Sequence, residues 1–120
     1  MSGIYTLSRV LVAFFGFTAL LGMVWFANSL SGAFMTAGLL MGFSSLAVAF
    51  VPQRKLSSGA ARRTLVTLCV VGIGTGLFLV ADALGASREI EWDVVAIRLL
   101  HIAALATMAV IALRQPSEST

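Results

Sequence analysis

The sequence is 120 residues long, with 59% hydrophobic and only 11% charged residues, and its mean hydropathy is +1.01. These values exclude an ordinary water-soluble domain, in which about 25% of residues are charged. The net charge is +3, but the basic residues stand in short segments between apolar runs without interleaved aromatic residues, which excludes a nucleic-acid-binding surface. The sequence therefore predicts an integral membrane protein in contact with the lipid bilayer.

Four apolar runs are long enough to cross a bilayer, whose hydrocarbon core of about 30 Å requires about 20 helical residues. In chain order, we expect helices over residues of about 9–29, 32–51, 64–84 and 93–113. The alternating pattern of a transmembrane β-barrel is absent, and backbone in lipid must form its own hydrogen bonds. The expected fold class is all-α: a polytopic, four-transmembrane-helix, up-down-up-down bundle that forms one membrane domain over residues 1–120.

Basic residues predict the orientation of this bundle, because Lys and Arg in short loops stay on the cytoplasmic side. The segment 52–63 begins at Pro52, which favours a helix end. It contains no acid and carries four of the eight basic residues: Arg54, Lys55, Arg62 and Arg63. Arg9 and Arg114 lie on the same side if the chain crosses four times. We therefore expect both termini in the cytoplasm, and the inner membrane of a bacterium as the location.

The expected helices contain a predicted intramembrane polar cluster, formed by Asp82, Arg98 and His101. A charge at the centre of the bilayer costs roughly 2.5 to 3.5 kcal/mol, and less near its edge. Asp82 and Arg98 should lie at similar depth in an antiparallel hairpin, so we expect them to form an ion pair. The alternatives for Arg98 are a structural clasp, a side chain that extends to the interface, and an anion-binding or proton-coupled role.

His101 is the only histidine in the chain and lies one turn beyond Arg98 on the same helix face. It is either a neutral side chain hydrogen-bonded inside the bundle, a proton relay, a quinone contact or one axial ligand of a haem. The chain has no second histidine, so a haem would need a ligand from a partner subunit. We expect no cofactor and no metal site, with His101 as the candidate if a cofactor is bound.

Glycines four residues apart occur in two of the expected helices, as Gly38 and Gly42 and as Gly72 and Gly76. This spacing places small residues on one helix face and allows backbones to approach closely. We interpret the four glycines as packing positions within the bundle. Pairing between protomers and the lining of an ion path are the alternatives.

Catalytic signatures are absent from the sequence: it has no phosphate-binding glycine loop, no CxxC or HExxH motif and no nucleophile elbow. We expect a non-enzymatic scaffold, accessory or regulatory subunit that assembles with other membrane proteins or with itself. One alternative is a small oligomeric channel or transporter, with a path lined by Asp82, Arg98 and His101, and by Ser44, Ser45 and Thr75. Another is a haem- or quinone-associated redox subunit that uses His101.

In size and number of spans, the chain resembles the small multidrug resistance exporters and the dimeric fluoride channels. The membrane-embedded glutamate in the first helix of those exporters has no counterpart, because residues 10–27 contain no acid. Of the phenylalanine and serine track of the fluoride channels, only the fragment Phe43-Ser44-Ser45 is present. The resemblance therefore extends to architecture and assigns no function.

Overall fold

A computed structural model describes residues 2–25, 32–85 and 92–114 of the chain. The helices are α1 (Ser2–Trp25), α2 (Gly32–Ala49), the 3-10 helix η2 (Gln53–Ser57), α3 (Gly59–Gly85) and α4 (Trp92–Arg114). The four α-helices are each long and apolar enough to span a membrane. The described helices are therefore those of a multi-pass membrane protein.

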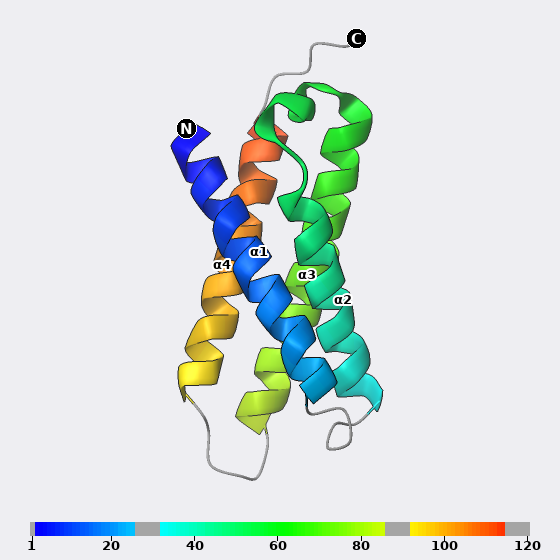
Figure 1. The fold of residues 1–120 in the computed structure, drawn as a ribbon, viewed down its shortest axis with the longest axis vertical. Coiled ribbons are helices and arrows are strands. Elements are labelled where there is room, and N and C mark those ends of the chain that lie inside the picture. The colour runs from blue at the N-terminus through cyan, green and yellow to red at the C-terminus, as the bar shows by residue number, and fades with distance from the viewer. Residues whose placement is uncertain (1, 26–31, 86–91, 115–120) are drawn as a thin grey trace.

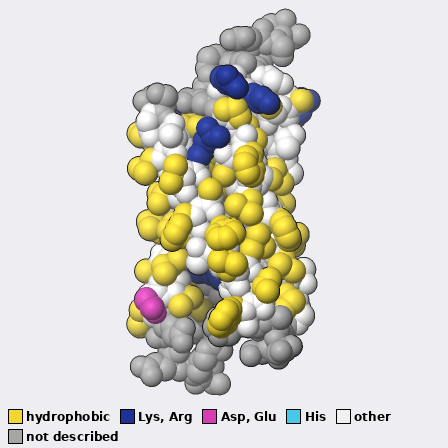
Figure 2. Space-filling view, in the orientation of Figure 1, with side chains coloured by type: hydrophobic (Ala, Val, Ile, Leu, Met, Phe, Trp, Pro, Cys, Tyr) yellow, Lys and Arg dark blue, Asp and Glu magenta, His cyan; other side chains and the backbone are white. Residues whose placement is uncertain are grey.

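The four α-helices run alternately in opposite directions and pack in chain order, and α4 closes the bundle against α1 (Figure 1). This arrangement confirms the predicted all-α four-helix bundle. The seam between α1 and α4 is less closely packed than the other three seams. Apolar side chains cover the flank of the bundle, and most of the visible basic side chains lie at the end that holds η2 (Figure 2).

Helix α1 begins at Ser2, although the sequence predicted a start near residue 9. That prediction treated the charge of Arg9 as a helix boundary. In the structure, Arg9 Nε donates a hydrogen bond of 2.9 Å to the carbonyl of Ala49, and the hydroxyl of Tyr5 donates one of 2.9 Å to the carbonyl of Val51. These contacts hold the first turns of α1 against the end of α2. Residues 26–29 of the predicted helix lie outside the described residues.

The connection between α2 and α3 is shorter than the predicted basic loop 52–63. Helix α3 begins at Gly59, so that Arg62 and Arg63 belong to its first turns. The long side chains of arginine can extend from a helix to the interface, so their charge does not require the helix to begin later. Leu56 is fully buried and anchors η2, which packs mainly against α3.

The other helix ends lie close to their predicted positions. Helix α2 ends at Ala49, where residue 51 was expected. Helix α4 extends one residue beyond the predicted range 93–113 at each end.

Glycines allow α1 and α2 to cross closely near the middle of the bundle. A Cβ atom added to Gly16 would lie 2.8 Å from Cβ of Ser45 and 3.2 Å from the carbonyl oxygen of Gly42. A side chain on Gly42 would likewise lie 3.2 Å from the carbonyl oxygen of Gly16. The remaining glycines of the predicted packing set face side chains of other helices: Gly38 faces Met23, Gly72 faces Leu105, and Gly76 lies between Met41 and Ile102.

Candidate functional site

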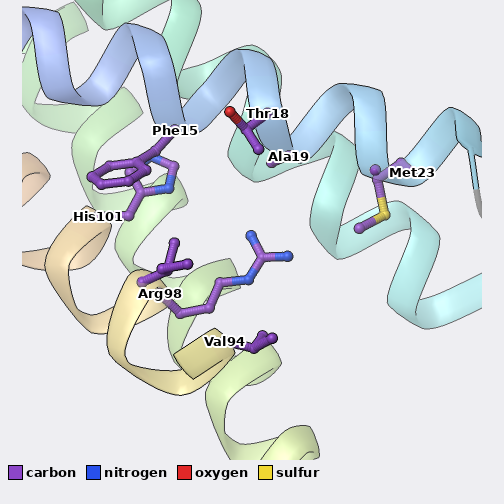
Figure 3. A pocket seen from close by; sticks show the side chains of 9 residues that line it. Phe15, Thr18, Ala19, Met23, Val94, Arg98 and His101 are labelled. Carbon is purple, nitrogen blue, oxygen red and sulfur yellow. The ribbon is translucent and has the colours of Figure 1, made fainter. Parts of the chain in front are cut away.

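A cavity of about 120 Å³ lies between α1 and α4, the less closely packed pair of neighbouring helices. Its walls include Phe15, Ala19 and Gly22 of α1 and Val94, Arg98 and His101 of α4 (Figure 3). A single water molecule requires about 10–15 Å³ of such space. The cavity therefore has room for several waters or for a small polar group, and we define it as the Arg98 cavity.

Arg98 is half-buried, and its side chain extends from α4 into the cavity toward α1 (Figure 3). Its Nη1 atom lies 3.9 Å from the sulfur of Met41, on α2. A thioether sulfur is a weak hydrogen-bond acceptor and cannot neutralise a cation. Within the described residues, Arg98 forms no ion pair. Its charge must therefore be stabilised by water or by an anionic group from outside this part of the chain.

His101 lies at the inner end of the Arg98 cavity and is 1% exposed. Its Nε2 shares a hydrogen bond of 2.7 Å with Oγ of Ser45, a fully buried residue of α2. The imidazole ring also contacts the ring of Phe15, with centroids 5.6 Å apart. This arrangement is the one expected for a structural histidine, whose buried nitrogen is satisfied by a partner.

Asp82 is exposed on α3. Thr75 and Phe78 line a groove of about 440 Å³ between α2 and α3. Asp82 follows these two residues by seven and four positions, so it lies on the same face of α3. The predicted ion pair between Asp82 and Arg98 is therefore not formed within the chain. Both residues lie near the same end of the bundle, but packing turns their side chains toward opposite seams.

The sequence also predicted a transport path lined by Ser44, Ser45 and Thr75. These residues do not extend the Arg98 cavity into a path through the described bundle. The hydroxyl of Thr75 donates to two carbonyls of its own helix, those of Val71 at 2.9 Å and Gly72 at 3.1 Å. Ser44 is buried on α2. Beyond His101, toward η2, apolar side chains such as Val12, Leu105 and Met108 are fully buried. In the described residues, the Arg98 cavity therefore ends at His101, and no polar path continues from it toward η2.

Metal-ligating side chains do not gather in the part of the chain that the structure describes, where no three of His, Cys, Asp and Glu lie close enough to hold an ion. Cys69 is a buried free thiol on α3. Searches against protein-family models, curated proteins and solved structures find no match for this chain. Its function must therefore be inferred from the geometry and charges of the bundle itself.

Proposed function

We propose that this chain is a non-enzymatic integral membrane subunit that acts by assembling with membrane-spanning protein, as a scaffold, accessory or regulatory component. The supporting observation is a contrast between the polar side chains of the bundle. Ser45 and His101, both buried, share a hydrogen bond. Arg98, half-buried in its cavity, and Asp82, exposed on α3, have no partner of opposite charge among the described residues. A partner that supplies charges of opposite sign would offset part of the free energy needed to place Arg98 and Asp82 in a membrane.

A second candidate function is that of an oligomeric channel or transporter, and the Arg98 cavity is the observation that favours it. The cavity combines a cationic side chain with space for water. It ends at His101, and buried apolar residues fill the interior beyond it. A continuous path would therefore have to run between protomers, which makes assembly the first property to test for this candidate as well.

A redox role has less support from the geometry of His101. Its Nε2 is already hydrogen-bonded to Ser45, so a haem iron or a quinone would have to use the other ring nitrogen or break this bond. Ligation by His101 would also require access to a side chain that is 1% exposed.

The proposed orientation places the η2 end of the bundle in the cytoplasm. The start of α1, the turn η2 and the end of α4 lie at this end (Figure 1). It carries Arg9, Arg54, Lys55 and their basic neighbours, and positive residues in short loops favour the cytoplasmic side. This distribution supports cytoplasmic termini, and we propose the inner membrane of a bacterium as the location.

The test of the proposed function is purification from the native membrane in a mild detergent or in nanodiscs, followed by native mass spectrometry and a visible absorption spectrum. We expect a complex of defined stoichiometry that lacks a chromophore. Replacement of Arg98 by Gln should weaken this complex, whereas Arg114→Gln, which removes an exposed cation at the end of α4, should not. A monomer in native membranes would contradict the proposal, and a stoichiometric chromophore would favour the redox role.

A further inference from the structure

We propose that copies of this chain associate side by side in the membrane, with Asp82 of one copy paired to Arg98 of the next. The proposal rests on the proposed function, assembly in the membrane, and specifies the partner as a second copy of the same chain. Asp82 is exposed on the α2–α3 side of the bundle, and Arg98 faces the cavity on the α1–α4 side. Each copy thus has an exposed carboxylate on its α2–α3 side and a half-buried guanidinium, recessed in the Arg98 cavity, on its α1–α4 side, and neither forms an ion pair with a described residue.

The depths of the two residues suit such a pair. Asp82 lies three residues before Gly85, the end of α3, which corresponds to about 4.5 Å along the helix axis. Arg98 lies six residues after Trp92, the start of α4, or about 9 Å along the axis. These helix ends lie at the same end of the bundle (Figure 1). Copies inserted in the same direction therefore place both charges near one membrane surface, and the long arginine side chain can span the difference.

The surfaces around both charges allow another helix to approach. On the Arg98 side, the wall of the cavity that belongs to α1 contains the half-buried Gly22. On the Asp82 side, the groove between α2 and α3 has the exposed small residues Ala33 and Gly74 beside the larger side chains of Leu40 and Phe78. Small residues let helix backbones come close in lipid, where a polar or ionic contact then holds them together. The small residues and the two charged residues therefore lie on the same two sides of the bundle.

The opposite placement of the faces determines the type of assembly. A contact between two different faces is heterologous, and it produces a closed ring or an extended row of copies. A two-fold dimer would bring two identical faces together and leave Asp82 opposite Asp82, or Arg98 opposite Arg98. The inferred contact therefore predicts a ring or row in which interior copies use both charges.

Two variants of the full-length chain test the contact by complementation in liposomes. The variant Asp82→Asn keeps Arg98, and the variant Arg98→Gln keeps Asp82. Each is labelled with a different fluorophore, and association is measured by energy transfer as the lipid is diluted. We expect each variant alone to self-associate at least about tenfold more weakly than the unaltered chain, which corresponds to about 1.4 kcal/mol. Mixed together, the two variants can form one intact pair, so transfer between them should return.

Matched controls separate this pairing from a general loss of charge. Asp93→Asn and Arg114→Gln remove exposed charges at the two ends of α4 and should leave self-association unchanged. Circular dichroism and thermal unfolding establish that each variant is folded. Asp82→Asn alters only an exposed side chain, so it tests the contact even if Arg98→Gln does not fold.

The outcomes distinguish this inference from the proposed function. Unchanged self-association of Asp82→Asn, or no recovery in the mixture of two folded variants, would overturn the pairing. If the unaltered chain does not self-associate in liposomes but forms a complex with other proteins in the native membrane, the second copy is the wrong partner and the proposed function stands. A chain that is monomeric in both settings would overturn the inference and the proposed function together.

Discussion

Ser45 of α2 and His101 of α4 share a hydrogen bond of 2.7 Å across the interior of the bundle, and both side chains are buried. The two helices are not neighbours around the bundle, since α2 packs mainly between α1 and α3. The bond therefore links diagonally opposed helices. In lipid, such a contact contributes about 0.6 kcal/mol on average and up to about 1.7 kcal/mol.

Replacement of Ser45 by Ala should destabilise the bundle. It removes the partner of His101 Nε2 and leaves that buried nitrogen unsatisfied, which costs about 1–3 kcal/mol. Thermal unfolding in detergent measures the loss. Thr36→Ala is the control, because the hydroxyl of Thr36 is exposed and bonds only to the carbonyl of Gly32 in its own helix. Equal stability of the two variants would contradict a structural role for the Ser45–His101 bond.

Replacement of Gly16 by Ala should also destabilise the bundle, by about 1–3 kcal/mol. The added methyl group would lie 2.8 Å from Cβ of Ser45 and 3.2 Å from a carbonyl oxygen of α2, so α1 and α2 would have to move apart. Gly3→Ala is the matched control on the same helix, since Gly3 is exposed and its added Cβ would meet no side chain and no other helix within 4 Å. Alanine favours helix over glycine by up to about 1 kcal/mol, so this control should be neutral or stabilising in the same unfolding measurement.

Tyr5→Phe should loosen the η2 end of the bundle. The change keeps the buried ring and removes the hydrogen bond of 2.9 Å from the hydroxyl to the carbonyl of Val51, worth about 0.5–1.5 kcal/mol. We expect faster cleavage by trypsin after Arg54 and Lys55 in η2. Trp25→Phe changes an exposed ring at the other end of α1 and should leave the rate unaltered. An unchanged rate in Tyr5→Phe would show that other contacts hold this turn.

A cysteine at Ser58 should be protected from a membrane-impermeant thiol reagent applied outside intact cells. Ser58 is exposed and lies beside η2, at the end that the distribution of positive charge assigns to the cytoplasm. A cysteine at the exposed Asp93, at the opposite end of the bundle, should be labelled under the same conditions. The native Cys69 is buried in α3, so it should not react with the reagent in either variant. The reverse pattern would invert the proposed orientation.

The sequence predicted the number and direction of the helices, because the length of an apolar run is set by the thickness of the bilayer. It also predicted that Asp82 and Arg98 lie near the same end of the bundle, since each lies within two turns of a helix end there. The start of α1 was misplaced for a physical reason. Arg9 was interpreted as a boundary charge, whereas its Nε donates to the carbonyl of Ala49, a contact between residues 40 positions apart.

The rotation of each helix about its own axis could not be predicted. Core and lipid both select apolar side chains, so these helices are apolar on all faces and carry little information about which face turns inward. Asp82 and Arg98 were therefore placed at a common depth but wrongly assigned to one seam. For the same reason Ser45 could be recognised as a polar residue of α2, while its hydrogen bond with His101 could not. The spacing of apolar and polar residues along a helix indicates its inward face only where the opposite face meets water.

The described part of helix α2 has 18 residues and a length of about 27 Å, close to the hydrocarbon thickness of about 30 Å. Its last carbonyls would then lie at the edge of the lipid, where water is scarce and an unsatisfied group costs several kcal/mol. Arg9 and Tyr5 supply donors to the carbonyls of Ala49 and Val51 from within the protein. We therefore expect this end of the bundle to meet the edge of the hydrocarbon layer without exposing these two carbonyls to lipid as unsatisfied groups.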